Sequence, residues 1–410
     1  MGNFVAVHLL KNYNPGTFNR GENGEAKQIM VGGVNRARFS SQCQKRAIRE
    51  IMACDEIRSS HIEDLISACL DVKVNDGTIT AEEKDLIGGL ICSKDIIGVD
   101  EHQWDAFMGR KDSKGKDFNV KRVVVTTNAS EINALINTFI DYYKENGKDA
   151  LVKNYKTVAT NTALNDVNIS VAKALFGTMA TDGVLGTVDG ALQMGQAYSV
   201  DAFMPEPDFF SVKFVGRSGA TPDDPFFGAY NDFSNTESQK AAGETINAGL
   251  ALNSSLMYSY ANINIKELER NLNTFVGTRA YEEKDIKNLV TKTITDFVQA
   301  MIKMTPEATQ NRSASYVEPT MVLVEVIEDD TNLQPDWSKC LSLGVKSIAE
   351  QAIEKMSAFA NNKTFRTGKI TQFVMFGSDY SDFANMFEAT NITNLNDLTN
   401  SIKDVVMPLI

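Results

Sequence analysis

Lysine and arginine are concentrated at the start of a chain that is acidic overall. The 410 residues carry a formal net charge of −12. Residues 1–50, however, contain eight Lys or Arg and three Glu, which gives this segment a local charge of +5. A polyanion binds to a local basic surface, whatever the sign of the total charge. The chemistry that these residue types could do is therefore anion binding, with phosphate as the expected anion.

Three of these cations are spaced so that one helix would carry them. Lys45 and Arg46 fall near the start of a helix predicted to open at Ser40–Gln42. The helix dipole disfavours cations there by about 0.3–1 kcal/mol each. Lys45 and Arg49 are four residues apart, so they share a face and repel each other. A phosphate held by free backbone N–H groups, the serine hydroxyls and the Gln42 amide would explain this placement.

Four more cations precede the helix, and two glycines lie among them. Gly32 and Gly33 allow a ligand to approach the backbone closely, and Arg20, Lys27, Arg36 and Arg38 add positive charge. The alternative is a solvated basic helix face, which the spacing alone favours. The upstream cations shift the interpretation towards phosphate binding.

A second basic segment spans residues 110–122 and reads RKDSKGKDFNVKR. It has six basic and two acidic residues and no apolar period, which is typical of a polar loop. A solvated loop is the default interpretation. The hypothesis beside it is a weak, sequence-independent contact to duplex DNA target through Lys111, Lys114, Lys116 and Lys121.

The elements that must position these residues can be predicted from pattern. Residues 3–10 are rich in apolar and β-branched types and predict a buried strand, and residues 36–39 predict a second. Ser41 and Gln44 then match a capping box. The predicted helix covers residues 42–53, and its apolar face comprises Ala47, Ile48, Ile51 and Met52.

Residues 58–160 are predicted to be mainly helical. Further helix starts are predicted where Ser60 is followed by Glu63, Thr80 by Glu83 and Asn128 by Glu131, and a helix end is predicted at Gly147. We interpret this stretch as an insertion between strands.

The remainder of the chain predicts a return to one sheet. Residues 201–255 have the composition of a long protruding loop or hairpin. Strands are predicted at 320–326 and 370–376, and helices at 282–304, 346–360 and 395–406. The expected fold is an α+β sandwich that carries two insertions.

Several function classes lack their signatures. The five cysteines form no CxxC pair, and His8, His61 and His102 are far apart in sequence, so we expect neither a zinc site nor a disulfide framework. No phosphate-loop GxxxxGK[ST] and no GxSxG motif occurs. We expect no catalytic residues, no metal, no cofactor, no membrane contact and a cytoplasmic location.

Four sequence blocks resemble the CasC-type backbone subunits of the type I-E CRISPR Cascade complex, which belong to the RAMP superfamily. The late blocks are Phe176–Thr181 with Val188–Ala191, Tyr258–Asn264, and Thr305-Pro306 with Gln310-Asn311. The first and most specific comprises His8–Leu10, Asn19-Arg20, Lys27, Gly32–Gln42 and Lys45–Arg49.

The resemblance implies a non-catalytic, RNA-binding ribonucleoprotein subunit with an RRM-like (ferredoxin-like) palm, inserted helical fingers and a protruding thumb. Its partners would be CRISPR RNA (crRNA), target DNA, copies of itself in a filament and other Cascade subunits, which together act in antiviral defense. On this chain the palm would cover residues 1–57, 161–200 and 256–410, the fingers 58–160 and the thumb 201–255.

The resemblance also implies which residues contact the guide. Met179 would pack against the kinked strand, although a core role is equally expected, and Phe209-Phe210 on the thumb would press on a displaced base. The full set of expected crRNA-binding residues is Arg20, Lys27, Arg38, Ser40, Gln42, Lys45, Arg46, Arg49, Met179, Phe209, Phe210, Gln310, Asn311 and Arg312.

The sequence departs from the family pattern in places. Thr178 and Thr309 stand where the family has a cation, Arg312 is a candidate replacement, and Phe226-Phe227 compete for the thumb role. Two other functions stay open. One is a type III-like backbone subunit that cleaves target RNA, for which Glu22 would have to bind the metal. The other is a stand-alone single-strand RNA-binding protein.

Overall fold

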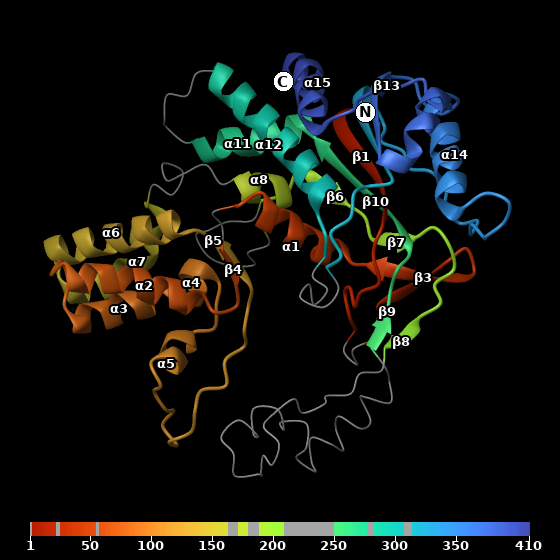
Figure 1. Cartoon of the computed structure of the whole chain (residues 1–410). Helices are drawn as coiled ribbons and strands as arrows, with labels where there is room; N and C mark the ends of the chain where they lie inside the picture. Colours follow the sequence, from red (N-terminus) through yellow and green to blue (C-terminus); the bar gives the residue numbers. More distant parts are fainter. Residues whose placement is uncertain are drawn as a thin grey trace, which may run out of the picture. The chain divides into compact units, whose positions relative to one another are not determined.

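The computed structural model describes residues 2–21, 25–54, 57–162, 171–178, 188–208, 250–276, 283–306 and 314–410. The chain divides into two compact units, whose elements are labelled in Figure 1. The first comprises Met1–Met52, Met194–Asn262 and Thr295–Val405, and the second comprises Ala53–Gln193, Ile263–Ile294 and Val406–Ile410. Helices and one extended mixed sheet together confirm the α+β class.

The first unit is organised around a sheet with strand order β13-β12-β11-β1-β10-β7-β3-β2. Antiparallel pairing joins β1 to β11, β11 to β12, β10 to β7, β7 to β3 and β3 to β2, whereas β12 and β13 are parallel. The strands are β1 (Gly2–Asn12), β2 (Gln28–Val31), β3 (Val34–Phe39), β7 (Ala197–Ser199), β10 (Leu256–Asn264), β11 (Met321–Asp330), β12 (Lys369–Phe376) and β13 (Thr390–Asn391).

Strand β1 is buried on both faces, which explains its nearly continuous apolar sequence. Ala6 and Leu10 face a core built with α14 (Ile348–Asn361), to which Ile353 and Met356 contribute. Smaller elements of this unit are β8 (Glu206–Asp208), β9 (Leu250–Leu252), η2 (Ser378–Met386) and α15 (Leu395–Val406). Helix α12 (Glu283–Lys303) runs from the second unit into the first, and β6 (Leu192–Met194) is where the chain enters the first unit.

A buried polar network crosses four strands of this sheet: β1, β10, β11 and β12. Glu325 in β11 accepts from Arg366 at 2.6 Å and from Gln372 at 2.8 Å, and its second oxygen lies 3.3 Å from His8 Nε2. Burial alone would raise the pKa of Glu325, but the hydrogen bond from His8 and the charges of His8 and Arg366 lower it to about 2. Tyr258 completes the network at 2.9 Å from His8 Nδ1.

Helix α1 (Ser41–Ile51) follows β3 directly, one residue earlier than predicted. Its N-cap is Ser40, whose Oγ accepts from Cys43 N at 3.3 Å, so the predicted capping box at Ser41 is wrong. Gln44 is fully buried, and its Nε2 donates to the carbonyl of Gly195 at 3.1 Å, with longer contacts to the carbonyls of Phe39 and Ser40. Its Oε1, which a capping box would use, has no hydrogen-bond partner among the described residues. Ile51, predicted on the apolar face, is 43% exposed.

The second unit has a helical core. Its apolar cluster brings together Ile66, Leu70, Ile87, Trp104 and Phe139, among others. The helices are α2 (Ile62–Asn75), α3 (Ala81–Ile91), α4 (Lys94–Ile97), α5 (Gln103–Phe107), α6 (Ala129–Asn146), α7 (Lys148–Thr160), α8 (Val171–Phe176) and α11 (Ile265–Val276), with β4 (Ile57–Ser59) paired to β5 (Val125–Thr127) and η3 (Met407–Leu409) near the C-terminus.

Most predicted helix boundaries in this unit are confirmed. Thr80 and Glu83 form a reciprocal capping box, Asn128 caps α6, and Gly147 ends α6 with a φ of 80°. The box predicted at Ser60 is wrong, because Glu63 turns inward to Arg122 and Gln103 and the N-cap position is taken by His61.

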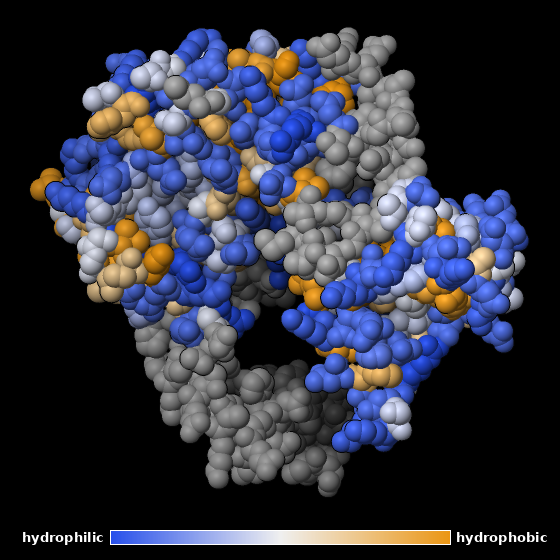
Figure 2. Space-filling model, turned by 180° about the vertical axis from the view of Figure 1, so that it is seen from behind, coloured by the Kyte–Doolittle hydropathy of each residue, from blue (hydrophilic) through white to orange (hydrophobic). Residues whose placement is uncertain are grey.

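On the face shown in Figure 2, the described residues form a mainly hydrophilic surface, and the hydrophobic ones lie in small separate patches. Among the described residues, no helix is both long enough and apolar enough to span a membrane.

Candidate nucleic-acid interface

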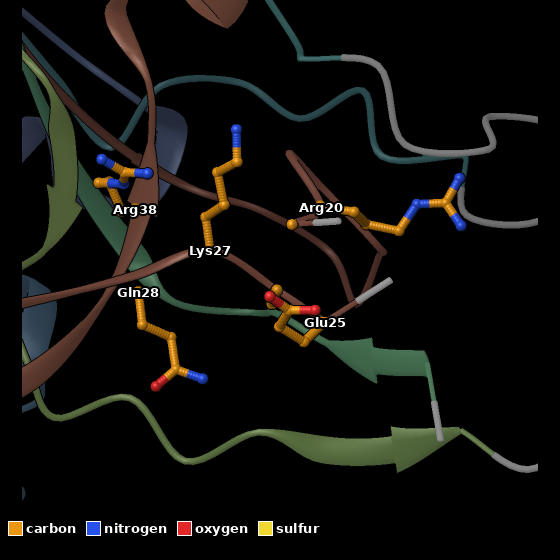
Figure 3. Close-up of a pocket in the computed structure, with 7 residues that line it drawn as sticks. Arg20, Glu25, Lys27, Gln28 and Arg38 are labelled. Atoms are coloured by element: carbon orange, nitrogen blue, oxygen red, sulfur yellow. The ribbon is translucent and has the colours of Figure 1, made fainter. Parts of the chain in front are cut away.

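A basic cavity lies at the edge of the first unit's sheet, beside β2 and β3. Its volume is about 600 Å³, and its lining includes Arg20, Gly21, Glu25, Lys27, Gln28 and Arg38 (Figure 3). Three of the predicted phosphate-binding cations, separated by up to 18 positions in sequence, therefore meet around one cavity. We call this cavity the basic pocket.

Backbone hydrogen bonds fix the rim of the basic pocket. Arg20 and Ala26 form an antiparallel bridge, and Gly21 N donates to Glu25 O at 2.8 Å. Lys27 O then accepts from Arg38 N at 2.9 Å, which attaches the rim to β3. The cations thus project from paired backbone, so their positions are set by the fold.

The pocket's charged side chains have few protein partners. Arg38 Nη1 lies 3.5 Å from Gln196 Oε1, and its Nε is buried without a hydrogen-bond partner in the described part of the chain. No ion pair joins Arg20, Lys27 or Glu25 to another of the residues that the structure describes. Because unpaired cations around a cavity favour an anion, the pocket suits a phosphate.

Asn19 connects the basic pocket to the start of α1. Its carbonyl accepts from Lys27 N at 3.3 Å, and its Oδ1 accepts from Ser40 N at 2.8 Å. Its φ is 43°, a left-handed conformation that Asn tolerates better than most residues. Sequence analysis did not assign Asn19 a role, although an Asn just before a Gly-containing turn is a usable signal.

The first turn of α1 has no acidic residue, as expected for an anion site. Gln42 is exposed, and Lys45 and Arg49 are half-buried. The Arg46 Nε bonds to Glu50 Oε1 at 3.1 Å on the solvent side of the helix. The structure therefore places Ser40, Gln42, Lys45 and Arg49 on the element adjoining the pocket, with Arg46 engaged in a surface ion pair.

The remaining predicted guide contacts lie outside the described residues. These are Met179, Phe209, Phe210, Gln310, Asn311 and Arg312, together with the alternatives Glu22 and Phe226-Phe227. The two parts of one block of the family resemblance do meet within the second unit: Thr178 and Val188 exchange backbone hydrogen bonds at 2.9 and 3.2 Å.

The second basic segment, in the second unit, is an ordered loop. Asp112 Oδ1 accepts from the backbone N–H of Lys114 and of Lys116, both at 2.8 Å, and Phe118 stacks on His102 at 4.6 Å. Arg110 and Arg122 are anchored by carboxylates, Arg110 by Asp85 and Asp105 and Arg122 by Glu63.

The lysines of this loop are presented differently from its arginines. All four are exposed, and none forms an ion pair with another residue that the structure describes. The four are Lys111, Lys114, Lys116 and Lys121, and we call them the loop lysines. Fixed backbone with unpaired ammonium groups suits sequence-independent phosphate contacts.

An α+β unit with unpaired cations around a pocket beside a helix start has the charge and geometry that anion binding requires. Within the described residues, no group of His, Cys, Asp and Glu is arranged to hold a metal ion.

The chain belongs to the family of CT1975-like proteins, whose model matches residues 5–213 and 218–401. It is similar in fold to a chain of a solved "CRISPR RNA-guided surveillance complex, pre-nicking", with a TM-score of 0.69 and 18% identity over 98% of this chain and 100% of the other. A chain of a second "CRISPR RNA-guided surveillance complex" matches with a TM-score of 0.63 and 17% identity over 98% and 99%. No curated protein sequence matches.

Proposed function

We propose that this chain is a repeated, non-catalytic subunit of a type I-E-like CRISPR surveillance complex that binds the backbone phosphates of the guide RNA. The observation that carries the proposal is the basic pocket, where Arg20, Lys27 and Arg38 meet beside the start of α1. Membership of the CT1975-like family and likeness to chains of RNA-guided complexes support it.

Phosphate binding by this surface is independent of base sequence, which a subunit must achieve if it is to carry any guide. Copies of the chain would line up along one RNA, each holding a few phosphates with the pocket and α1. An RRM-like palm, and wedge residues such as Met179 and Phe209-Phe210, belong to the same proposal. Base pairing between guide and target would supply the sequence specificity.

The loop lysines give the second unit a role in the proposal. Their ammonium groups would hold the phosphates of the duplex DNA target weakly while pairing is tested. The ion pairs of Arg110 and Arg122 anchor the loop and support this role. Because the loop backbone is already ordered, DNA binding does not have to pay the entropy of ordering it.

The test of guide binding is the salt dependence of affinity for single-stranded RNA. Arg20→Ala combined with Lys27→Ala removes two unpaired cations of the pocket. We expect the slope of log K against log salt to become shallower by about 1.4, since each phosphate contact to a single strand contributes about 0.7.

The matched control removes the same charge elsewhere in the first unit, with Lys363→Ala and Lys403→Ala, both exposed. This control should leave the slope within about 0.3 of the original. Equal slopes for the pocket variant and the control would refute the assigned site. Cleavage of complementary RNA by the assembled complex with Mg²⁺ would refute the non-catalytic role.

A further inference from the structure

The basic pocket contains one group that phosphate binding does not use. Glu25 lines the cavity among Arg20, Lys27 and Arg38, and its side chain is exposed to the cavity's solvent (Figure 3). A carboxylate at this point repels a phosphate, so it weakens the function proposed for its neighbours. A site that binds only phosphate would be better without it.

The backbone of the rim sets the point from which Glu25 projects. Glu25 O accepts from Gly21 N at 2.8 Å, and the Glu25 carboxylate lies beside Gly21, where a Cβ would overlap it. Gly21 is not in the left-handed region. Gly21 therefore leaves room for the carboxylate in this position, and the side chain of Glu25 is free to turn towards a bound strand.

Glu25 forms no ion pair with Arg20, Lys27 or Arg38, the described cations that line the same cavity. Its oxygens are thus available as acceptors at the wall of the cavity in which a phosphodiester would lie. In RNA, the hydroxyl donor nearest to each phosphate is the ribose 2′-OH, which DNA lacks. A carboxylate accepts from a hydroxyl through a short, charge-assisted hydrogen bond.

We infer that Glu25 accepts a hydrogen bond from the 2′-OH of the nucleotide whose phosphate the basic pocket holds, and so makes the pocket selective for RNA over DNA. This inference rests on the proposed function. It explains why a carboxylate lines a phosphate pocket. The charge of Glu25 repels the phosphate of any strand, and the hydrogen bond from the 2′-OH restores affinity for RNA alone. Such selectivity matters to a protein that meets guide RNA and target DNA together.

The experiment compares binding of the full chain to three single strands of one sequence: RNA, DNA and 2′-fluoro RNA. The 2′-fluoro strand keeps the RNA-like sugar conformation but has no hydroxyl donor. The wild-type chain should bind RNA more tightly than 2′-fluoro RNA by about ten-fold, the scale of one hydrogen bond to a charged group.

Two variants separate hydrogen bonding from charge. Glu25→Ala removes the acceptor, and the preference for RNA over both other strands should fall to about two-fold or less. Glu25→Gln keeps an acceptor oxygen but not the charge, so it should retain an intermediate preference. Both variants should bind DNA more tightly than the wild type, because the repulsion is gone.

The outcomes are distinct. If both variants strengthen RNA and DNA binding by the same factor, Glu25 only adjusts charge and the inference is wrong. If Arg20→Ala with Lys27→Ala weakens all three strands while the Glu25 variants keep the full RNA preference, the proposed function survives and the inference does not. If the Arg20 and Lys27 changes have no effect, the pocket is not the guide site and both are wrong.

Discussion

Lys11, in the middle of the first unit, is a charged residue in an unfavourable place. It is 2% exposed, and its Nζ donates to the carbonyls of Met304 at 3.0 Å and Ile302 at 3.4 Å, at the end of α12. Those carbonyls form the negative end of the helix dipole, which explains why a cation is tolerated. Burial nevertheless lowers the pKa of Lys11 to about 8.

The lowered pKa of Lys11 predicts that stability rises with pH over part of the alkaline range. Between about pH 8 and 10 the folded state gives up a proton that the unfolded state keeps, so the free energy of unfolding increases. Between about pH 7.5 and 9.5, the free energy of unfolding of the wild type should rise by on the order of 1 kcal/mol more than that of Lys11→Met. Urea unfolding at the two pH values measures this, and a parallel pH response of both proteins would contradict it.

Glu325 predicts a dependence of the same sign at acidic pH, where stability again rises with pH. Its pKa falls from 4.5 to about 2 on folding, so the stability it contributes is present above pH 5 and is lost as pH falls towards 2. Glu325→Gln leaves Arg366 buried without its carboxylate partner, which costs about 3–5 kcal/mol at neutral pH.

Urea unfolding between about pH 3 and 7 tests this, because the variant should lose less stability on acidification than the wild type. Glu328→Gln in the same strand is the control, since the ion pair that Glu328 forms within the described residues is with the exposed Lys369. If Glu325→Gln and Glu328→Gln lower the free energy of unfolding equally at neutral pH, Glu325 does not stabilise the buried Arg366.

Sequence reasoning predicted His8 on a buried strand but not this network. Its partners Tyr258 and Glu325 are 250 and 317 positions away, and no local pattern encodes which strands become neighbours. The cations of the pocket were found because their residue types carry the signal. Glu25 was missed because a lone carboxylate in a basic segment resembles ordinary surface composition.

At the scale of elements, helix α1 shows how closely a boundary can be predicted. Ser40 and Ser41 are adjacent and chemically equivalent, so the sequence allowed either as the cap. The structure selects Ser40 because Gln44, the would-be partner of Ser41, is drawn into the core by Gly195, 151 positions away. The local sequence pattern predicts that a helix forms here, but a tertiary contact determines the residue at which the helix begins.

The two serines provide a matched pair for experiment. Ser40→Ala removes the acceptor for Cys43 N and should lower the free energy of unfolding by about 1 kcal/mol. Ser41→Ala, at the first helical position, should cost less than about 0.5 kcal/mol. Thermal or urea unfolding of both variants checks this, and a larger loss for Ser41→Ala would mean that the cap is misassigned.

At the scale of the whole molecule, the α+β class followed from alternating apolar patterns, and family membership followed from four sequence blocks. The predicted bounds of palm, fingers and thumb stay a prediction, and the structure divides into two units that are each assembled from three separate stretches of chain. Periodicity and capping patterns predict the structure of one segment at a time. Which segments pack together depends on contacts between residues hundreds of positions apart.

The loop lysines make a prediction that belongs to the assembled complex. Replacing all four with alanine should weaken binding of duplex DNA target several-fold at low salt and flatten its salt dependence, because phosphate contacts release counterions. The control replaces four exposed lysines on α6 and α7: Lys144, Lys148, Lys153 and Lys156. Target binding that responds equally to both quadruple variants would show a general charge effect and remove the loop's role.

The central claim is that this chain holds guide RNA by its phosphates. The most direct measurement is to produce the chain with its neighbouring genes and a CRISPR array, and to sequence the nucleic acid that copurifies. We predict discrete RNA of repeat-plus-spacer sequence in a large assembly, reduced by Arg20→Ala with Lys27→Ala and by Lys45→Ala with Arg49→Ala. A well-folded protein that carries heterogeneous RNA or none, in wild type and variants alike, would contradict the account.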